Sequence, residues 1–131
     1  MGRNIMTQDV KTESDQGIKF DKGHEKLRYD LIPPGPLAEL AYVYTRGAEK
    51  YADRNWEKGM AWGRIFRAMI QHAFNFWMGR SRHEKGMHSL GSVAWCAFTL
   101  MQYEHSYPNL DTRPDGGHSW EPKDVIGADD I

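Results

Sequence analysis

Residues 88–105 read HSLGSVAWCAFTLMQYEH, and this stretch decides the fold because it has the pattern of a buried helix. No Asp, Glu, Lys or Arg occurs between His88 and Tyr103. An apolar stripe recurs at helical spacing and consists of Leu90, Val93, Ala94, Ala97, Phe98 and Met101. The opposite face is small and uncharged and consists of Ser89, Ser92, Cys96 and Thr99. A helix without a charged face is usually buried on both sides, so we expect a second subunit to complete its surroundings, unless the chain's own tails cover it.

Two further helices are predicted upstream. Residues 36–51 begin with a proline suited to a first helical turn and then show helical spacing at Leu37, Leu40, Ala41, Tyr44, Ala48 and Tyr51. Residues 61–79 end at a glycine and carry an apolar face of Ile65, Phe66, Met69, Ile70, Ala73, Phe74 and Trp77. No strand pattern or internal repeat stands out. The sequence therefore predicts an all-α fold, a small bundle of three main helices completed by oligomerisation.

Changes in composition divide the chain into three expected segments. Residues 1–25 are polar and form an N-terminal tail, residues 26–106 form the helical domain, and residues 107–131 form an acidic C-terminal tail. The single Cys cannot form an internal disulfide, which is typical of a reducing compartment. No apolar run is long enough to span a membrane, and the N-terminus lacks the apolar core of a signal peptide. We expect a cytoplasmic protein without a membrane partner.

The net charge of −1 hides an uneven distribution. Residues 58–85 hold six basic side chains and one acidic side chain, whereas residues 104–131 hold seven acidic and two basic ones. A basic middle segment suits phosphate groups on a partner, although both segments could equally be ordinary solvated faces. The segment lacks a dense Lys/Arg run, and the sequence pI is near 6.6. Polymeric nucleic acid is therefore not an expected partner.

Four carboxylates on or just beyond the helix at 36–51 are the candidate metal-binding and catalytic groups. Glu49 and Asp53 are four residues apart and would share a helical face, and Glu39 and Glu57 flank them. Carboxylates on facing helices are a common way to hold Mg²⁺, which prefers oxygen ligands. The same spacing is also typical of a solvated helix surface, so the residues alone leave both interpretations open.

A second group of residues could bind a nucleotide. Lys50, Tyr51, Asn55 and Trp56 offer an ammonium group, two aromatic rings and an amide, which suit a phosphate and a base. Trp56 could equally close the core. His72 lies mid-helix with Asn75 almost one turn further on, and it could contact a ligand or be a satisfied core histidine. His83, Glu84 and His88 cluster near the second loop without a diagnostic spacing, and the lone Cys96 suits packing better than nucleophilic attack.

Several motifs together resemble one known family. The chain contains Lys26-x-Arg28-x-Asp30-Leu31-Ile32-Pro33-Pro34, then Gly47-Ala48-x-Lys50-Tyr51, then Arg54-Asn55-Trp56-Glu57-Lys58-Gly59. His72, Trp77-x-Gly79, Glu84-x-Gly86, Leu90-x-Ser92-Val93-Ala94-Trp95 and Asp111-x-Arg113-Pro114 continue the match. The chain is similar in these residues to the phage dATP/dGTP diphosphohydrolase N-terminal domain family, and the similarity covers roughly residues 18–114.

The resemblance implies an all-α, oligomeric nucleotide pyrophosphohydrolase related to MazG-like enzymes, working in the cytoplasm of a phage host. Such enzymes cleave a nucleoside triphosphate to the monophosphate and pyrophosphate beside Mg²⁺ or Mn²⁺. Residues 26–106 would then be the nucleotide-binding domain, with Glu39, Glu49 and Asp53 as metal ligands and Glu57 as a further catalytic carboxylate. Nucleotide contacts would come from Lys50, Tyr51, Asn55, Trp56, Arg64, Arg67, His72, Asn75 and Arg80.

Three departures from the family pattern favour an alternative. Arg80 and Arg82 stand where the family usually has acidic residues, and Ser89 replaces a histidine. Exchanging acidic residues for arginines would convert a metal site into a site that binds phosphate without a metal ion. The alternative is therefore a catalytically silent protein that sequesters a nucleotide, such as a signalling nucleotide of a host defence. A helical interaction protein without a ligand is the third interpretation.

Overall fold

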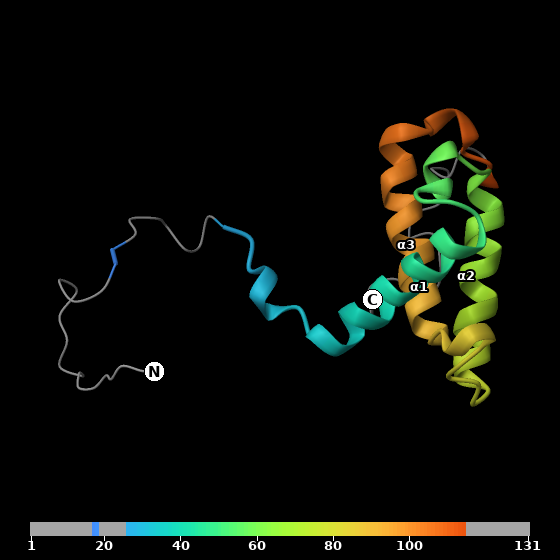
Figure 1. Cartoon of the computed structure of the whole chain (residues 1–131). Coiled ribbons are helices and arrows are strands. Elements are labelled where there is room, and N and C mark those ends of the chain that lie inside the picture. Colours follow the sequence, from blue (N-terminus) through green and yellow to red (C-terminus); the bar gives the residue numbers. More distant parts are fainter. Residues whose placement is uncertain (1–16, 19–25, 115–131) are drawn as a thin grey trace, which may run out of the picture. The chain divides into compact units, whose positions relative to one another are not determined.

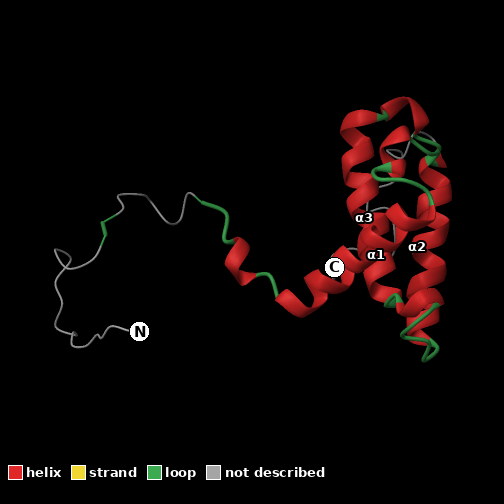
Figure 2. Cartoon of the chain, in the orientation of Figure 1, coloured by secondary structure: helices red, strands yellow, loops and turns green. Residues whose placement is uncertain are grey.

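The computed structural model describes residues 17–18 and 26–114, and it is built from helices (Figure 1). The long helices are α1 (Pro34–Lys50), α2 (Trp62–Trp77) and α3 (Ser89–Ser106). Short 3-10 helices lie before, between and after them: η3 (Tyr29–Leu31), η4 (Asn55–Lys58), η5 (Glu84–Gly86) and η6 (Pro108–Leu110). Within the described ranges there is no strand, only an isolated bridge between Arg82 and His88 (Figure 2). The predicted all-α fold is confirmed, and no described helix is long and apolar enough to cross a membrane.

Local sequence signals explain where the helices begin and end. α1 starts within a Pro-rich stretch, because proline fits a first turn whose N–H groups have no helical partner. α2 ends where Gly79 adopts φ +92°, a left-handed conformation that costs glycine little. α3 is capped by His88, whose Nδ1 accepts a hydrogen bond of 3.0 Å from the Leu90 amide. The helices predicted at 36–51, 61–79 and 88–105 agree with these boundaries to within two residues.

The chain divides into two compact units, Met1–Ile32 and Pro33–Ile131. In the first unit, Arg28 donates two hydrogen bonds of 2.8 and 2.7 Å to the carboxylate of Asp30, beside η3. Most of the predicted N-terminal tail, residues 1–25, lies outside the described residues. The second unit contains α1, α2 and α3 and is the part that positions the site.

The core of the second unit lies mainly between α2 and α3, with α1 packed on α3. Trp62 and Ile65 of α2 meet Cys96 and Tyr103 of α3, and all four side chains are buried. The Tyr103 hydroxyl donates to the backbone carbonyl of Trp56, which ties η4 to α3. Burial of these side chains supplies the main packing energy of the bundle.

α3 turns its small face inward, not its apolar stripe. Ser89 and Thr99 are completely buried, and Ser92 and Cys96 nearly so. A Cβ on Gly91 would lie 3.2 Å from the Glu39 carbonyl oxygen, which shows how closely α1 approaches α3. The predicted apolar stripe points the other way: its larger members Leu90, Phe98 and Met101 are 41 %, 49 % and 59 % exposed. The small face is thus covered within this chain, and self-association stays a prediction.

Residues 107–113 pack over the start of α2. The Trp62 indole donates to the Tyr107 carbonyl at 3.1 Å, and the Gly63 amide donates to Thr112 Oγ1 at 2.9 Å. Gly59, with φ +93°, allows the Tyr107 ring to approach, since a Cβ there would lie 2.8 Å from it. The first residues of the predicted C-terminal tail are thus part of the folded unit, and residues 115–131 lie outside the described residues.

Candidate functional site

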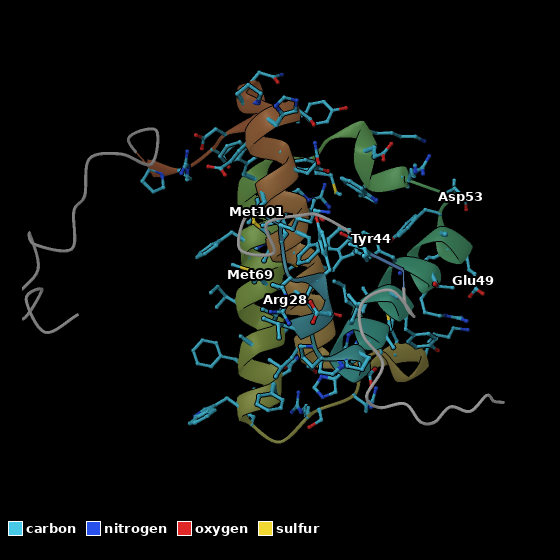
Figure 3. All side chains as sticks on the ribbon, turned by 90° about the vertical axis from the view of Figure 1, so that its left-hand side faces the viewer. Arg28, Tyr44, Glu49, Asp53, Met69 and Met101 are labelled. Atoms are coloured by element: carbon cyan, nitrogen blue, oxygen red, sulfur yellow. The ribbon has the colours of Figure 1, made fainter. Side chains whose placement is uncertain are left out.

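An open cleft of about 1280 Å³ lies beside the bundle and is large enough for a nucleotide. Its walls are the second half of α1, the turn and η4 that follow, one side of α2, the loop containing η5, and part of α3. Figure 3 shows Tyr44, Glu49 and Asp53 on the α1 side, with Met69 and Met101 on the opposite side of the bundle. The cleft is therefore built by the elements around α1, on one side of the α2–α3 pair only.

Aromatic rings form one part of the cleft. The Tyr44 ring lies 6.2 Å from both Trp56 and Trp95, measured between ring centroids. Tyr51 is 63 % exposed, and the Lys50 ammonium lies 5.3 Å from its ring centroid. This distance is within the range of a cation–π contact. The site therefore offers exposed ring surface next to a positive charge, the combination that suits a base linked to phosphate.

Two histidines stack on the opposite wall. The rings of His72 (α2) and His83 lie 4.8 Å apart at 29°, and His83 Nε2 is 2.7 Å from the Ser92 hydroxyl oxygen. His72 Nδ1 is buried and has no hydrogen-bond partner among the described residues. Burial lowers the pKa of His72, and the neighbouring His83 lowers it further. His72 therefore has a buried ring nitrogen with unused hydrogen-bonding capacity in the wall of the cleft.

Positive charge exceeds negative charge along the cleft. The lining includes the cationic side chains of Arg46, Lys50, Arg54, Arg64 and Lys85, against the carboxylates of Glu49, Asp53 and Glu84. Two of the cations are paired within it: Arg46 Nη1 lies 2.5 Å from Glu49, and Lys50 Nζ lies 3.9 Å from Glu84. Among the described residues, neither Arg64 nor Lys85 forms an ion pair. These two cations of the lining are therefore the ones best available to an incoming phosphate.

Three of the four candidate carboxylates are paired with arginines, and among the described residues Asp53 forms no ion pair. Arg82 donates two hydrogen bonds of 2.6 and 2.8 Å to Glu39, and this contact holds the pKa of the Glu39 carboxyl below its ordinary value. Glu49 pairs with Arg46, and Glu57 lies 3.7 Å from Arg54. No group of three or more His, Cys, Asp or Glu side chains in the described part of the chain is arranged to hold a metal ion. The donor set therefore does not fit the Mg²⁺ site that the resemblance implies.

The structure brings together only part of the predicted site. Eight of its residues line the cleft: Glu49, Lys50, Tyr51, Asp53, Asn55, Trp56, Arg64 and His72. Five lie outside its lining: Glu39, Glu57, Arg67, Asn75 and Arg80. Four of the five have contacts of their own. Glu39 binds Arg82, Glu57 pairs with Arg54, Asn75 accepts a hydrogen bond from Gln71, and the Arg80 carbonyl accepts one from Ser89. Glu57 also lines a second, smaller cleft of about 440 Å³. No ligand is present, so the role of each residue stays a prediction.

Among the lining residues that sequence reasoning missed are Trp95, Arg46 and Lys85. Trp95 belongs to the α3 motif that carried the resemblance, but the motif did not indicate that its ring faces Tyr44. Arg46 lies one turn before Lys50, and Lys85 lies in η5, where its backbone accepts a 2.6 Å hydrogen bond from the Tyr42 hydroxyl. The i, i+4 spacing of Arg46 and Lys50 could have indicated a shared face, whereas the placement of Lys85 depends on the loop.

Two of the family departures have structural roles in this chain. Arg82 joins the loop before α3 to α1 through Glu39, and its Nη1 also donates to the Gly86 carbonyl at 3.1 Å. The Ser89 hydroxyl is buried and donates to the Arg80 carbonyl at 2.7 Å. These contacts fix the loop at the edge of the cleft. Arg82 and Ser89 therefore stabilise the conformation of the loop, in addition to changing the local charge.

Comparison with known proteins gives one finding. A family model described as dATP/dGTP diphosphohydrolase, N-terminal, matches residues 16–113, which includes every helix described above. No curated protein and no solved structure shows a significant match to the chain.

Proposed function

The chain belongs to the dATP/dGTP diphosphohydrolase N-terminal family, and on that premise we propose that its cleft binds a nucleoside phosphate and holds it without metal-dependent cleavage. The observation that carries the second half of this proposal is the pairing of carboxylates with arginines. Glu39, Glu49 and Glu57 each have an arginine partner, and the described residues contain no metal-binding cluster. The protein would act as a nucleotide-sequestering member of a hydrolase family.

The proposed binding mode assigns the base to the rings and the phosphates to the cations. A base would stack on Tyr51 or Trp56, and the Asn55 amide would meet its edge. Phosphate oxygens would accept hydrogen bonds from Arg64 and Lys50. Because the lining holds more cationic than acidic groups, it attracts an anion without an intervening metal ion.

A second candidate function is hydrolysis to the monophosphate and pyrophosphate. The family description favours it, and two carboxylates of the predicted metal set, Glu49 and Asp53, line the cleft. A Mg²⁺ or Mn²⁺ ion would supply charge neutralisation and an activated water if it bound there. This candidate requires Glu49 to leave Arg46, since an ion-paired carboxylate is a weak metal ligand.

The two candidates differ in what is recovered after binding. The purified chain is incubated with dATP, dGTP, the ribonucleotides, and cyclic and ADP-ribose-type nucleotides, with Mg²⁺ or with EDTA. Half of each mixture is heat-denatured before chromatography. We expect a nucleotide to leave the free pool in both buffers and to return intact on heating. Monophosphate and pyrophosphate in the Mg²⁺ samples alone would contradict sequestration and establish the hydrolase.

A matched pair of arginines tests the location of the site. Arg64 lines the cleft, whereas Arg67, one turn further along α2, does not. We expect Arg64→Glu to weaken nucleotide binding by roughly 10- to 100-fold, because it replaces a phosphate contact with repulsion. Arg67→Glu makes the same charge change and should alter the affinity less than about threefold at moderate salt. Isothermal titration calorimetry measures both, and equal losses would move the site out of the cleft.

A further inference from the structure

The short helix η4 carries two of the proposed nucleotide contacts, Asn55 and Trp56, but it is too short to hold its own conformation. The Glu57 amide donates to the Arg54 carbonyl at 2.9 Å. The Gly59 amide donates to the Trp56 carbonyl at 3.2 Å. A single helical turn is unstable in water, because so few hydrogen bonds do not offset the entropy lost on ordering it. Contacts with other elements must therefore fix the conformation of η4.

The backbone on either side of η4 is in the left-handed region. Arg54, just before its first residue, has φ +57°, and Gly59, just after its last, has φ +93°. Glycine adopts this conformation at little cost, whereas an arginine is strained there and stays only where surrounding contacts hold it. The strain at Arg54 is a second reason why η4 needs support from outside.

Two tyrosine hydroxyls give that support from the end of α3. Tyr103 donates to the Trp56 carbonyl, and Tyr107, just after α3, donates to the Glu57 carbonyl at 2.6 Å. Neither tyrosine lines the large cleft, but both line the second cleft of about 440 Å³, together with Trp56 and Glu57. Because open space lies beside η4 here, hydrogen bonds across it are needed to keep η4 in place.

Tyr107 is itself held firmly. Its ring meets the Tyr103 ring edge-on, at 5.4 Å between centroids, and its carbonyl accepts the hydrogen bond from the Trp62 indole. The Arg113 guanidinium lies 4.8 Å from the centroid of the Trp62 ring and donates to Asp111 at 3.0 and 2.8 Å. The Asp111-x-Arg113 motif therefore covers Trp62 and supports the segment that contains Tyr107.

We propose that Tyr107, together with Tyr103, is a positioning residue for the base of the bound nucleotide. Its hydroxyl holds η4 where Asn55 and Trp56 line the cleft, and the segment after α3 acts on the site through this hydrogen bond. The proposal rests on the proposed function, which assigns the base to these residues. Loss of the hydroxyl should weaken contact with the base and leave the phosphate contacts in place.

The phosphate side of the cleft has a matching hydrogen bond. Arg64 and Lys85, the cations best available to phosphate, lie on α2 and in η5, away from η4. The Tyr42 hydroxyl donates to the Lys85 carbonyl at 2.6 Å, the same length as the bond from Tyr107 to Glu57. Tyr107→Phe and Tyr42→Phe therefore remove the same kind of hydrogen bond from opposite parts of the site.

Calorimetric titration in EDTA tests the proposal, with dATP and dGTP as probes because the family description names them. Tyr107→Phe should weaken binding by about three- to tenfold, the usual effect of one hydrogen bond. This loss should be equal at low and high salt (about 50 and 300 mM), because salt screens ionic contacts and hardly affects base stacking. The loss in Tyr42→Phe should be smaller at high salt, because this variant displaces a cation.

Hydrogen exchange of the chain without nucleotide tests the same hydrogen bond directly. Tyr107→Phe should speed exchange of the Glu57 and Gly59 amides by about three- to tenfold, because η4 opens more often. Exchange within α2 and α3 should not change. Tyr42→Phe should leave the η4 amides as they are in the unmodified chain. Faster exchange throughout α2 and α3 in Tyr107→Phe would show a general loss of structure and would overturn the positioning role.

This proposal and the proposed function fail in different ways. An unmodified chain that binds neither probe would overturn the assignment of the base to η4, and the positioning role would fail with it. An unmodified chain that binds, with unchanged affinity in Tyr107→Phe, would overturn the positioning role alone. The same holds if the losses in Tyr107→Phe and Tyr42→Phe depend on salt in the same way.

Discussion

The two sides of the α2–α3 pair differ in the side chains that they bury and expose. The side packed on α1 buries small side chains such as Ser89 and Thr99, whereas the outer side exposes large apolar ones such as Phe74 and Trp77. Close approach of two helices needs small residues at the contact, and the approach of α1 to Gly91 is an example. Burial on α3 is therefore determined by the distance to its neighbours, and hydrophobicity alone does not identify the inner face.

Substitutions on the inner side of the α2–α3 pair should cause the largest loss of folding stability. Tyr103 is fully buried and donates a hydrogen bond to Trp56, so Tyr103→Ala removes both packing and a tie to η4. We expect it to lower the free energy of unfolding by about 3 to 5 kcal/mol. Met101→Ala, two residues earlier and 59 % exposed, should cost less than about 1 kcal/mol. Urea unfolding measures both variants, and similar losses would refute the assignment of inner and outer sides.

Neighbouring residues on α3 give a smaller and sharper test. Thr99 is fully buried, whereas Phe98 is 49 % exposed. Thr99→Leu adds volume where the helices are closest and should cost about 1 to 3 kcal/mol. Phe98→Leu changes a surface side chain and should alter stability by less than about 0.5 kcal/mol. The same unfolding measurement compares them, and a larger cost for Phe98→Leu would show that the apolar stripe is the inner face.

The fold could be predicted from the sequence because helix periodicity and end signals are local. Proline at the start of α1 and glycine after α2 gave boundaries within two residues of those observed. The orientation of α3 could not be predicted in the same way. Hydrophobicity favours burial of Phe98, but three short helices cannot cover every apolar side chain, and small residues pack more closely.

The site was predictable where its residues are adjacent in sequence. Lys50, Tyr51, Asn55 and Trp56 all line the cleft because one turn carries them. Arg67 and Arg64 could not be separated, since a small rotation of α2 decides which of them reaches the cleft. The pairing of Glu39 with Arg82 joins positions 43 residues apart, and local sequence patterns do not report such a contact.

The smallest expected effect is the change of folding stability with pH that His72, on the cleft side of α2, contributes. Burial lowers the pKa of His72 below its ordinary value of 6.5, so the folded state favours the neutral ring. The unfolded chain takes up a proton near its ordinary pKa, and below that pH it gains protons that the folded state does not. The stability contributed by His72 is therefore present above about pH 6.5 and is lost as the pH falls through the lower folded pKa. Urea midpoints at pH 7.5 and 5.5 measure the loss.

His72→Gln should make this pH dependence shallower, because glutamine does not titrate. His105→Gln, on the exposed end of α3, removes a histidine that is far from the stacked pair and should leave the dependence as it is in the unmodified chain. If His72→Gln and His105→Gln flatten the curve equally, the stacked histidines do not contribute specially to acid sensitivity. If only His72→Gln does so, the cleft side of α2 carries the acid-sensitive group, within the wall that His72 and His83 form.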